Sequence, residues 1–191
     1  MTVADKPELY LHTVADWQQW LEGSPSPDGV RLRLRKVSST QPGFTYAEAL
    51  DVALCFGWID GQALSLDDEF FLRVFTPRRR NSPWSKVNRA HVERLVAEGR
   101  MQPGGQAEVD RAKADGRWDA AYRMSDDVVP ADLQAALDAS SAAAAAFAGL
   151  TKQNRFAIVY RLGSVKRAET RDRKLGEYIA MLERGETIHP Q

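Results

Sequence analysis

The stretch that decides the fold of this chain is residues 45–88, TYAEALDVALCFGWIDGQALSLDDEFFLRVFTPRRRNSPWSKVN. It opens with a T-x-x-E capping box, in which Thr45 and Glu48 each bond the other residue's backbone N–H. This signature predicts a helix from Thr45 to about Phe56. Because nearly all of its later residues are apolar, we expect the helix to be mostly buried and to end at Gly57.

The second half of the stretch predicts a hairpin and a basic loop. Residues 58–61, Trp-Ile-Asp-Gly, have the composition of a turn, because Asp beside Gly commonly hydrogen-bonds the backbone of a reversal. Residues 62–66 and 69–75 are predicted to be strands joined at an Asp-Asp pair. A basic loop, residues 76–88, then leads into a helix that Ser85 caps and that ends at Gly99.

The chain before this stretch predicts further sheet and one more helix. Residues 8–12 are typical of a short strand, and Thr13 is placed to cap a helix over residues 14–22. Residues 30–37 alternate with a period of two, which predicts a strand with one buried face. We expect its arginines, Arg31, Arg33 and Arg35, to form a solvated face.

The chain after residue 100 is predicted to be helical. Pro103 can start a helix that ends near Gly116, and three further helical stretches cover residues 130–140, 141–161 with a break near 149–151, and 168–184. The pattern predicts an α+β protein, with a small, mostly antiparallel sheet and covering helices in the N-terminal half and a helical C-terminal half. We expect residues 1–100 to form the α+β core and residues 101–191 to pack on it as one compact unit.

Composition excludes several classes of protein. The chain has 191 residues, of which 43% are hydrophobic, and its 26 basic and 26 acidic residues cancel, so net charge does not point to nucleic acid or a membrane. Cys55 is the only cysteine, which excludes an intrachain disulfide and a cysteine-rich zinc site. The three histidines are far apart in the sequence, and we predict no metal and no cofactor. Without a secretory signal or an apolar span, we expect a cytoplasmic location.

Charge is segregated along the deciding stretch. Residues 44–72 contain six acids and no Lys or Arg, whereas residues 73–100 contain eight basic residues and two acids. Cations, amides and hydroxyls before a helix N-terminus are suited to binding an anion, and a tryptophan there can stack on a ring. We predict that an anionic small molecule or a protein partner binds in a pocket formed by Trp58, Asp60, Arg78, Arg79, Trp84, Ser85, Lys86 and Asn88.

Other interpretations of these residues stay open. If the protein is an enzyme, Asp60 is the candidate acid or base, with Arg79 or Lys86 holding a phosphate or carboxylate. The loop could instead be structural, with its cations neutralising the nearby acids. Nucleic acid could bind the loop together with a second basic stretch, residues 150–174, which includes Lys166. Cys55 lies at a helix C-terminus, where the macrodipole disfavours a thiolate, so we interpret it as a buried structural residue.

Several motifs in order resemble one known family across nearly the whole chain. They are ALDVALCFGWIDG at residues 49–61, FTPRRRNSPWSKVN at 75–88, EGRM at 98–101, KADGRWDAAY at 113–122, KQNRFAIVYRL at 152–162, VKRAETRDRK at 165–174 and MLERGETIHP at 181–190. The pattern resembles the YdeI/OmpD-associated, or bacteriocin-protection, family. The resemblance implies a role in stress or bacteriocin tolerance and implies no reaction, cofactor or catalytic residue, so we expect a non-enzymatic binding protein.

Overall fold

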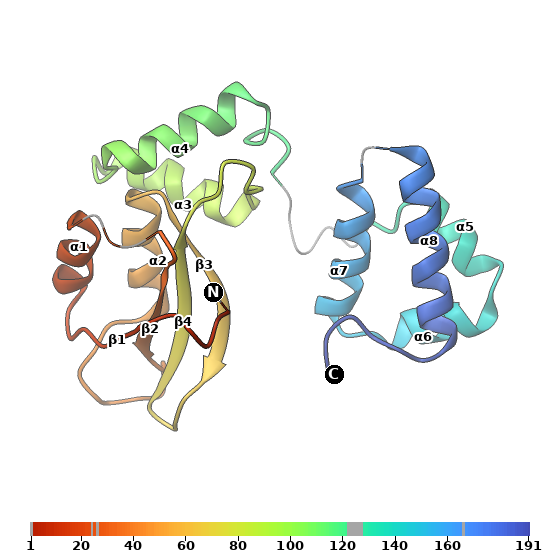
Figure 1. Ribbon diagram of the computed structural model, residues 1–191, viewed down its shortest axis with the longest axis horizontal. Coiled ribbons are helices and arrows are strands. Elements are labelled where there is room, and N and C mark those ends of the chain that lie inside the picture. The colour runs from red at the N-terminus through yellow and green to blue at the C-terminus, as the bar shows by residue number, and fades with distance from the viewer. Residues whose placement is uncertain (1, 24, 26, 122–127, 166) are drawn as a thin grey trace. The chain divides into compact units, whose positions relative to one another are not determined.

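The computed structural model describes residues 2–23, 25, 27–121, 128–165 and 167–191. It divides the chain into two compact units, Met1–Tyr122 and Arg123–Gln191. Figure 1 shows the first unit with its sheet and helices α1 to α4, and the second with helices α5 to α8 only. The predicted α+β class, with a helical C-terminal half, is confirmed.

The sheet of unit 1 has four strands in the order β1-β2-β4-β3. The strands are β1 (Glu8–Leu9), β2 (Val30–Arg35), β3 (Trp58–Ser65) and β4 (Phe70–Pro77). Strand β1 runs parallel to β2, and the β2·β4 and β3·β4 pairs are antiparallel. The prediction of a small, mostly antiparallel sheet is therefore confirmed, with β3 at one edge.

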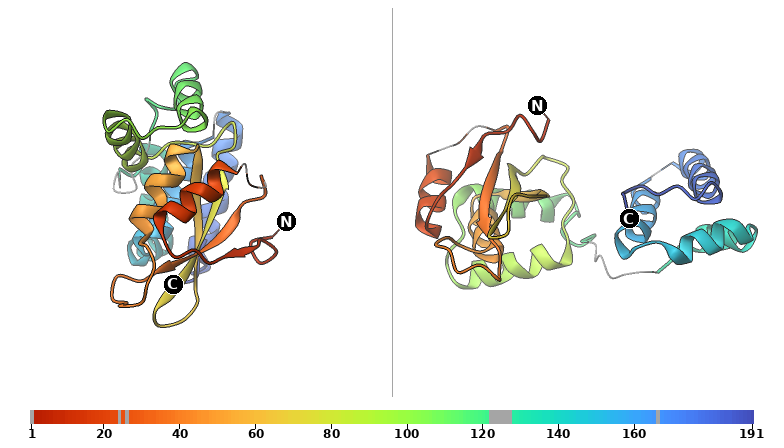
Figure 2. Two further views of the ribbon diagram at one scale, coloured as in Figure 1. Left: turned by 90° about the vertical axis from the view of Figure 1, so that its left-hand side faces the viewer. Right: turned by 90° about the horizontal axis from the view of Figure 1, so that it is seen from below.

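Among its described residues, unit 1 has four helices, and α2 is the most enclosed of them. They are α1 (Val14–Glu22), α2 (Tyr46–Cys55), α3 (Lys86–Ala97) and α4 (Pro103–Ala114). Figure 2 shows α1 and α2 together against one face of the sheet, and α3 and α4 both contact α2. The expected capping box at Thr45 is present, as is the Ser85 cap of α3. Six of the ten α2 residues are buried, which confirms the mostly buried helix.

The structure corrects the predicted turn at residues 58–61. These residues begin strand β3, and the reversal is made by Gly57, whose φ of 78° is in the left-handed region that favours glycine. A register shift between Asp60 and Ala63 shows that Gly61 lies in a β-bulge, where one strand carries an extra residue. The Asp-Gly pair therefore marks a bulge inside a strand, which has much the same residue preferences as a turn.

The arginines of β2 are not a simple solvated face, although all three are only half-buried. The Nε of Arg31 donates to the Lys6 carbonyl over 2.9 Å, and Arg35 Nη1 donates to the Ser39 carbonyl over 2.7 Å. The Arg33 guanidinium lies 4.5 Å from the ring centroid of Tyr10 and 4.4 Å from that of Phe70. These arginines cover the second face of the sheet with their own side chains.

Glycines allow α4 to approach the C-terminal end of α2. The backbone N–H of Gln102 donates to the Cys55 carbonyl over 3.1 Å. A Cβ placed on Gly105 would lie only 2.1 Å from that same carbonyl oxygen, so the contact requires glycine. Helix α4 and the buried Trp118 after it belong to the core of unit 1. The division of the chain therefore falls at residue 122 and not near residue 100.

The described residues of unit 2 form four helices around a core of their own. They are α5 (Ala131–Asp138), α6 (Ser141–Gly149), α7 (Lys152–Gly163) and α8 (Ala168–Glu183). The predicted break near residues 149–151 separates α6 from α7. The core includes Leu133, Ile158, Leu162 and Leu182, each at most 1% exposed. The packing of the helical region on the α+β core stays a prediction.

A buried asparagine fastens the C-terminal segment to α7. Asn154 is 1% exposed, and its Nδ2 donates to the His189 carbonyl over 3.0 Å and to Gln191 Oε1 over 3.1 Å. Its Oδ1 accepts from the His189 N–H over 2.8 Å. Because buried amides require partners, this residue holds the tail in one position. Among the described residues, none of the helices is long and apolar enough to cross a membrane.

Because α4 approaches α2 closely at Gly105, we predict that one added methyl group at this position destabilises unit 1. Gly105→Ala should lower the free energy of unfolding of unit 1 by at least about 2 kcal/mol, because the new Cβ collides with backbone. Urea unfolding followed by tryptophan fluorescence measures this, since all five tryptophans lie before residue 122. Gly176→Ala in α8, where an added Cβ meets no atom within 4 Å, is the control, and it should leave the transition that tryptophan fluorescence reports unchanged. A fully stable Gly105→Ala protein would contradict the close contact.

The Asn154 contacts predict that unit 2 depends on its tail. Asn154→Ala should lower the stability of unit 2 by about 2 kcal/mol, because the half-buried backbone groups of His189 lose their hydrogen bonds to the buried amide. Unfolding followed by far-ultraviolet circular dichroism measures the helices. Gln153→Ala, an exposed neighbour on the same helix, should leave the transition unchanged. Equal behaviour of the two variants would show that the tail does not support the unit.

Candidate functional site

The basic loop predicted as part of the site is built on a buried stack of side chains. Arg78 is 7% exposed, and its guanidinium carbon lies 3.6 Å from the ring centroid of Trp84. Trp84, 2% exposed, meets Trp118 edge to face with centroids 5.0 Å apart. Arg117 Nη1 also donates to the Ser82 carbonyl over 2.7 Å. Cation–π and aromatic contacts of this kind hold a loop in a single conformation.

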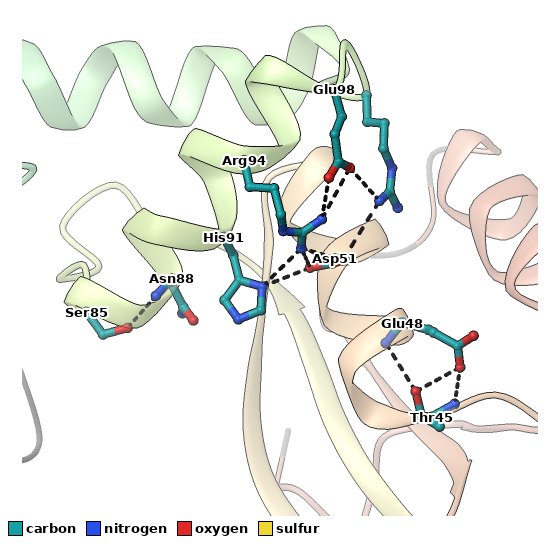
Figure 3. A network of polar contacts seen from close by, with 9 residues as sticks. Thr45, Glu48, Asp51, Ser85, Asn88, His91, Arg94 and Glu98 are labelled. Atoms are coloured by element: carbon teal, nitrogen blue, oxygen red, sulfur yellow. Dashed lines mark hydrogen bonds and ion pairs between the residues drawn. The ribbon is translucent and has the colours of Figure 1, made fainter.

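The loop presents two arginines and a helix N-terminus on the outside. Ser85 Oγ accepts from the Asn88 N–H over 3.1 Å, which Figure 3 shows at the start of α3. Arg79, Arg80 and Lys86 are exposed, and Asn88 is half-buried. In the part of the chain that the structure describes, neither Arg79 nor Arg80 takes part in an ion pair. Arg79 and Arg80 therefore carry positive charge that no ion pair among the described residues neutralises.

Trp58 belongs to the core of unit 1. It is 6% exposed and meets Trp17 and Trp20 edge to face, with ring centroids 6.4 and 5.7 Å apart. Its backbone pairs with Pro77, and the Arg78 N–H donates to the Gly57 carbonyl over 2.9 Å. The structure thus brings the backbones of Trp58 and Arg78 together, while the Trp58 ring packs against α1.

Asp60 is held by two residues that the predicted site did not include. Tyr46 donates its hydroxyl to Asp60 Oδ2 over 2.9 Å, and Arg73 Nε donates to the same oxygen over 3.1 Å. The Arg73 guanidinium also lies 4.8 Å from the Tyr46 ring centroid. Burial, followed by the Asp60 charge, raises the pKa of Tyr46 to about 12. Tyr46 thus stays a hydrogen-bond donor over the physiological range.

Asp60 and Asp67 of the deciding stretch pair with arginines of the sheet. Asp60 pairs with Arg73, and Asp67 lies 3.5 Å from Arg33. Asp67 also accepts from the backbone N–H groups of Glu69 and Phe70, so it shapes the hairpin end. Asp60 and Asp67 are therefore neutralised by arginines of the sheet, and not by the cations of the basic loop as the structural interpretation expected. Two clefts are lined by described residues, and none of the eight predicted site residues lines either of them. A pocket shared by Asp60 and Lys86 therefore stays a prediction.

A charged cluster between α2 and α3 was missed by the sequence pattern. Figure 3 shows Asp51 of α2 facing His91 and Arg94 of α3. His91 Nδ1 lies 2.9 Å from Asp51 Oδ1, and Arg94 Nη2 donates to both Asp51 oxygens over 2.7 and 2.6 Å. Arg94 also bonds Glu98, which bonds Arg100. Asp51 is the only acid after the first turn of α2, which is otherwise apolar there. An isolated acid on such a helix indicates a paired carboxylate, and the sequence offered this signal.

Cys55 lies one turn beyond Asp51 and is a core residue. It is 4% exposed, and burial raises the pKa of its thiol, which keeps the sulfur protonated and weakly nucleophilic. The small cleft beside it, about 140 Å³, is lined by Gln18, Val52, Cys55, Phe56, Arg100 and Gln102. Within the described residues, no group of three or more His, Cys, Asp or Glu side chains could hold a metal ion.

A larger cleft lies where β1 ends and α1 begins. Its volume is about 450 Å³, and its lining residues are Tyr10, Leu11, His12, Asp16, Gln19 and Trp20. Sequence patterns assigned these residues only to a strand and a helix. Their association could not be predicted, because it depends on how the segment before Thr13 folds back beside α1.

The Tyr46–Asp60 contact predicts an unusual phenol titration. Because its folded pKa is about 12 and the ordinary pKa of a tyrosine is 10.0, Tyr46 binds its proton more tightly in the folded state. The stabilisation of the folded state that comes from this raised pKa is therefore fully present below pH 10 and is lost as the pH rises through about 12. An ultraviolet difference titration of wild type against Tyr46→Phe should isolate a phenolate that forms near pH 12. A difference signal centred near pH 10 would contradict the buried contact.

Comparison with known families divides the chain much as the structure does. Residues 128–185 match the sequence profile described as "Bacteriocin-protection, YdeI or OmpD-Associated". Residues 9–108, more than half of the 191-residue chain, match a profile described as "Domain of unknown function (DUF8412)". The resemblance to the first family is thereby confirmed in unit 2, whereas the motifs before residue 109 fall in the second match. No curated protein and no solved structure shows a significant match. The chain belongs to the family described as DUF8412 through unit 1, and residues 128–185 of unit 2 are similar to the YdeI/OmpD-associated, bacteriocin-protection family.

Proposed function

We propose that the protein is a non-enzymatic, cytoplasmic binding protein with a role in stress or bacteriocin tolerance. It binds an anionic small molecule or an acidic partner at the basic loop, residues 76–88. The observation that carries this proposal is the pair of exposed arginines, Arg79 and Arg80, on a loop fixed by the Arg78–Trp84 stack. The bacteriocin-protection domain in unit 2 supports the tolerance role.

The geometry of the loop favours recognition of negative charge. The loop ends at the Ser85 cap of α3, where the positive end of the helix macrodipole lies. Guanidinium groups form paired hydrogen bonds with carboxylates and phosphates. A fixed backbone lowers the entropy lost when such a ligand binds.

Binding is better supported than catalysis, because the candidate reactive groups are engaged elsewhere. The Asp60 carboxylate already accepts hydrogen bonds from Tyr46 and Arg73, which limits its use as a base. Asp51 is similarly held by Arg94. The Cys55 thiol is buried and protonated. A general acid or base must reach its substrate with an available atom.

Nucleic-acid binding is the weaker alternative. Several arginines of the second basic stretch and its surroundings pair locally: Arg171 with Asp132, Arg173 with Glu177, and Arg184 with Glu186. Such pairs reduce the positive potential that phosphates would meet. Lys166, which belongs to this stretch, lies outside the described residues.

The proposal is tested by removing the two loop charges. Arg79→Gln/Arg80→Gln should weaken binding of fluorescein-labelled poly-L-glutamate about 5- to 30-fold, because each exposed charge contributes up to about 1 kcal/mol. Fluorescence polarisation measures the affinity, and added salt should weaken wild-type binding. Citrate and inorganic phosphate, used as competitors, distinguish a small-anion site from one that needs a polymer.

The matched control is Arg173→Gln/Arg184→Gln, which removes two arginines whose charges are already paired. This variant should bind like wild type. Equal losses in both double variants would mean that only net charge matters and would overturn the loop site. For the biological role, a bacteriocin-sensitive strain expressing wild type should survive better than one expressing the loop variant.

A further inference from the structure

The cleft between β1 and α1 has walls made of two aromatic rings. Trp20 stacks on the buried Trp17 with ring centroids 5.2 Å apart and an interplanar angle of 17°, so one of its faces is supported from behind. Tyr10 is 41% exposed and meets His12 and Phe70 edge to face at 4.7 and 5.8 Å. Both rings are therefore held in place by other rings, which is the condition for a preorganised wall.

One carboxylate defines the charge of the cleft. Asp16 Oδ2 accepts from the Thr13 N–H over 3.0 Å, and the Asp16 N–H donates to Thr13 Oγ1 over 3.1 Å. The hydrogen bonds from Thr13 lower the pKa of Asp16, which keeps the group ionised. The cap also fixes the direction of the side chain at the start of α1. Gln19, one turn along, adds an amide that can bond a hydroxyl or an amine.

We propose that this cleft binds an organic cation of the alkylammonium class, with Trp20 and Tyr10 facing the cationic carbon groups and Asp16 supplying the countercharge. Aromatic faces attract cations through the ring quadrupole, and Asp16 is the lining residue with a permanent charge. The volume of about 450 Å³ falls in the range of small-molecule sites, about 300–1,000 Å³. An anionic ligand would instead meet the negative faces of the rings and a carboxylate.

A cation already occupies part of this aromatic surface. The Arg33 guanidinium lies 4.5 Å from the Tyr10 ring centroid and pairs with Asp67 at 3.5 Å. This contact shows that the Tyr10 ring accepts a cation, and it leaves Trp20 as the main wall for a ligand. The cleft shares no lining residue with the basic loop, so the inference is independent of the proposed anion binding.

The test compares two molecules of the same shape. Choline carries the positive charge, and 3,3-dimethyl-1-butanol is its neutral isostere. Isothermal titration calorimetry on the full-length protein should show choline binding, with the neutral isostere at least about tenfold weaker. Equal binding of the two molecules would overturn charge recognition. Absence of choline binding at millimolar concentration would overturn the site itself.

Substitutions then assign the binding to the cleft. Asp16→Asn keeps an oxygen for the Thr13 N–H but removes the charge, and it should weaken choline binding about tenfold. Glu22→Gln removes an exposed carboxylate from the same helix outside the cleft and should leave binding unchanged. Tyr10→Ala, at an exposed position, provides a second variant should Asp16→Asn fail to fold, and it should also weaken binding. Unchanged binding in both cleft variants would place the cation elsewhere.

Discussion

The burial of α2 is the constraint on which unit 1 depends. A helix enclosed by α1, α3, α4 and β3 can keep few unsatisfied polar groups. Its N-terminus is closed by the Thr45–Glu48 box, and the Cys55 carbonyl accepts from Gln102. The Asp51 carboxylate accepts hydrogen bonds from Arg94 and contacts His91. The neighbours of α2 thus supply apolar surface and the hydrogen bonds that its polar groups need. Because Gln102 must come close to bond the Cys55 carbonyl, glycine is required at position 105, where α4 meets α2.

The candidate binding surfaces lie where this core meets the exterior. The basic loop leaves the end of β4, and its outer arginines are displayed because Arg78 and Trp84 are anchored inside. The β1–α1 cleft has the same construction, since Trp20 rests on the buried Trp17, which donates its Nε1–H to the Ala49 carbonyl of α2 over 3.1 Å. In both places a buried aromatic ring positions an exposed group. Preorganisation of this kind lowers the entropy that is lost when a ligand binds.

Part of the candidate site was predictable and part was not. The exposed Arg79 and Arg80 and the Ser85 cap follow from local composition, because loops carry charge outward and hydroxyls cap helices. Trp58 and Asp60 were placed in a turn, yet they lie in β3 with partners from α2 and β4. A strand interrupted by a bulge and a tight turn both favour Asp and Gly, so sequence could not separate them. The partner of Asp60, Arg73, is 13 residues away and meets it only across the ladder.

The sequence by itself determined the elements of this protein: the Thr45–Glu48 capping box, the Thr13 cap, the alternation of β2, the glycines after α2, α3 and α4, and the break between α6 and α7. These are local signals, set by backbone chemistry within a few residues. Only tertiary structure decided that residues 101–121 belong to unit 1, that Asp51 meets Arg94, and that Tyr10 and Trp20 line one cleft. Those outcomes depend on packing between distant segments, where shape and burial select a partner from many of the same residue type.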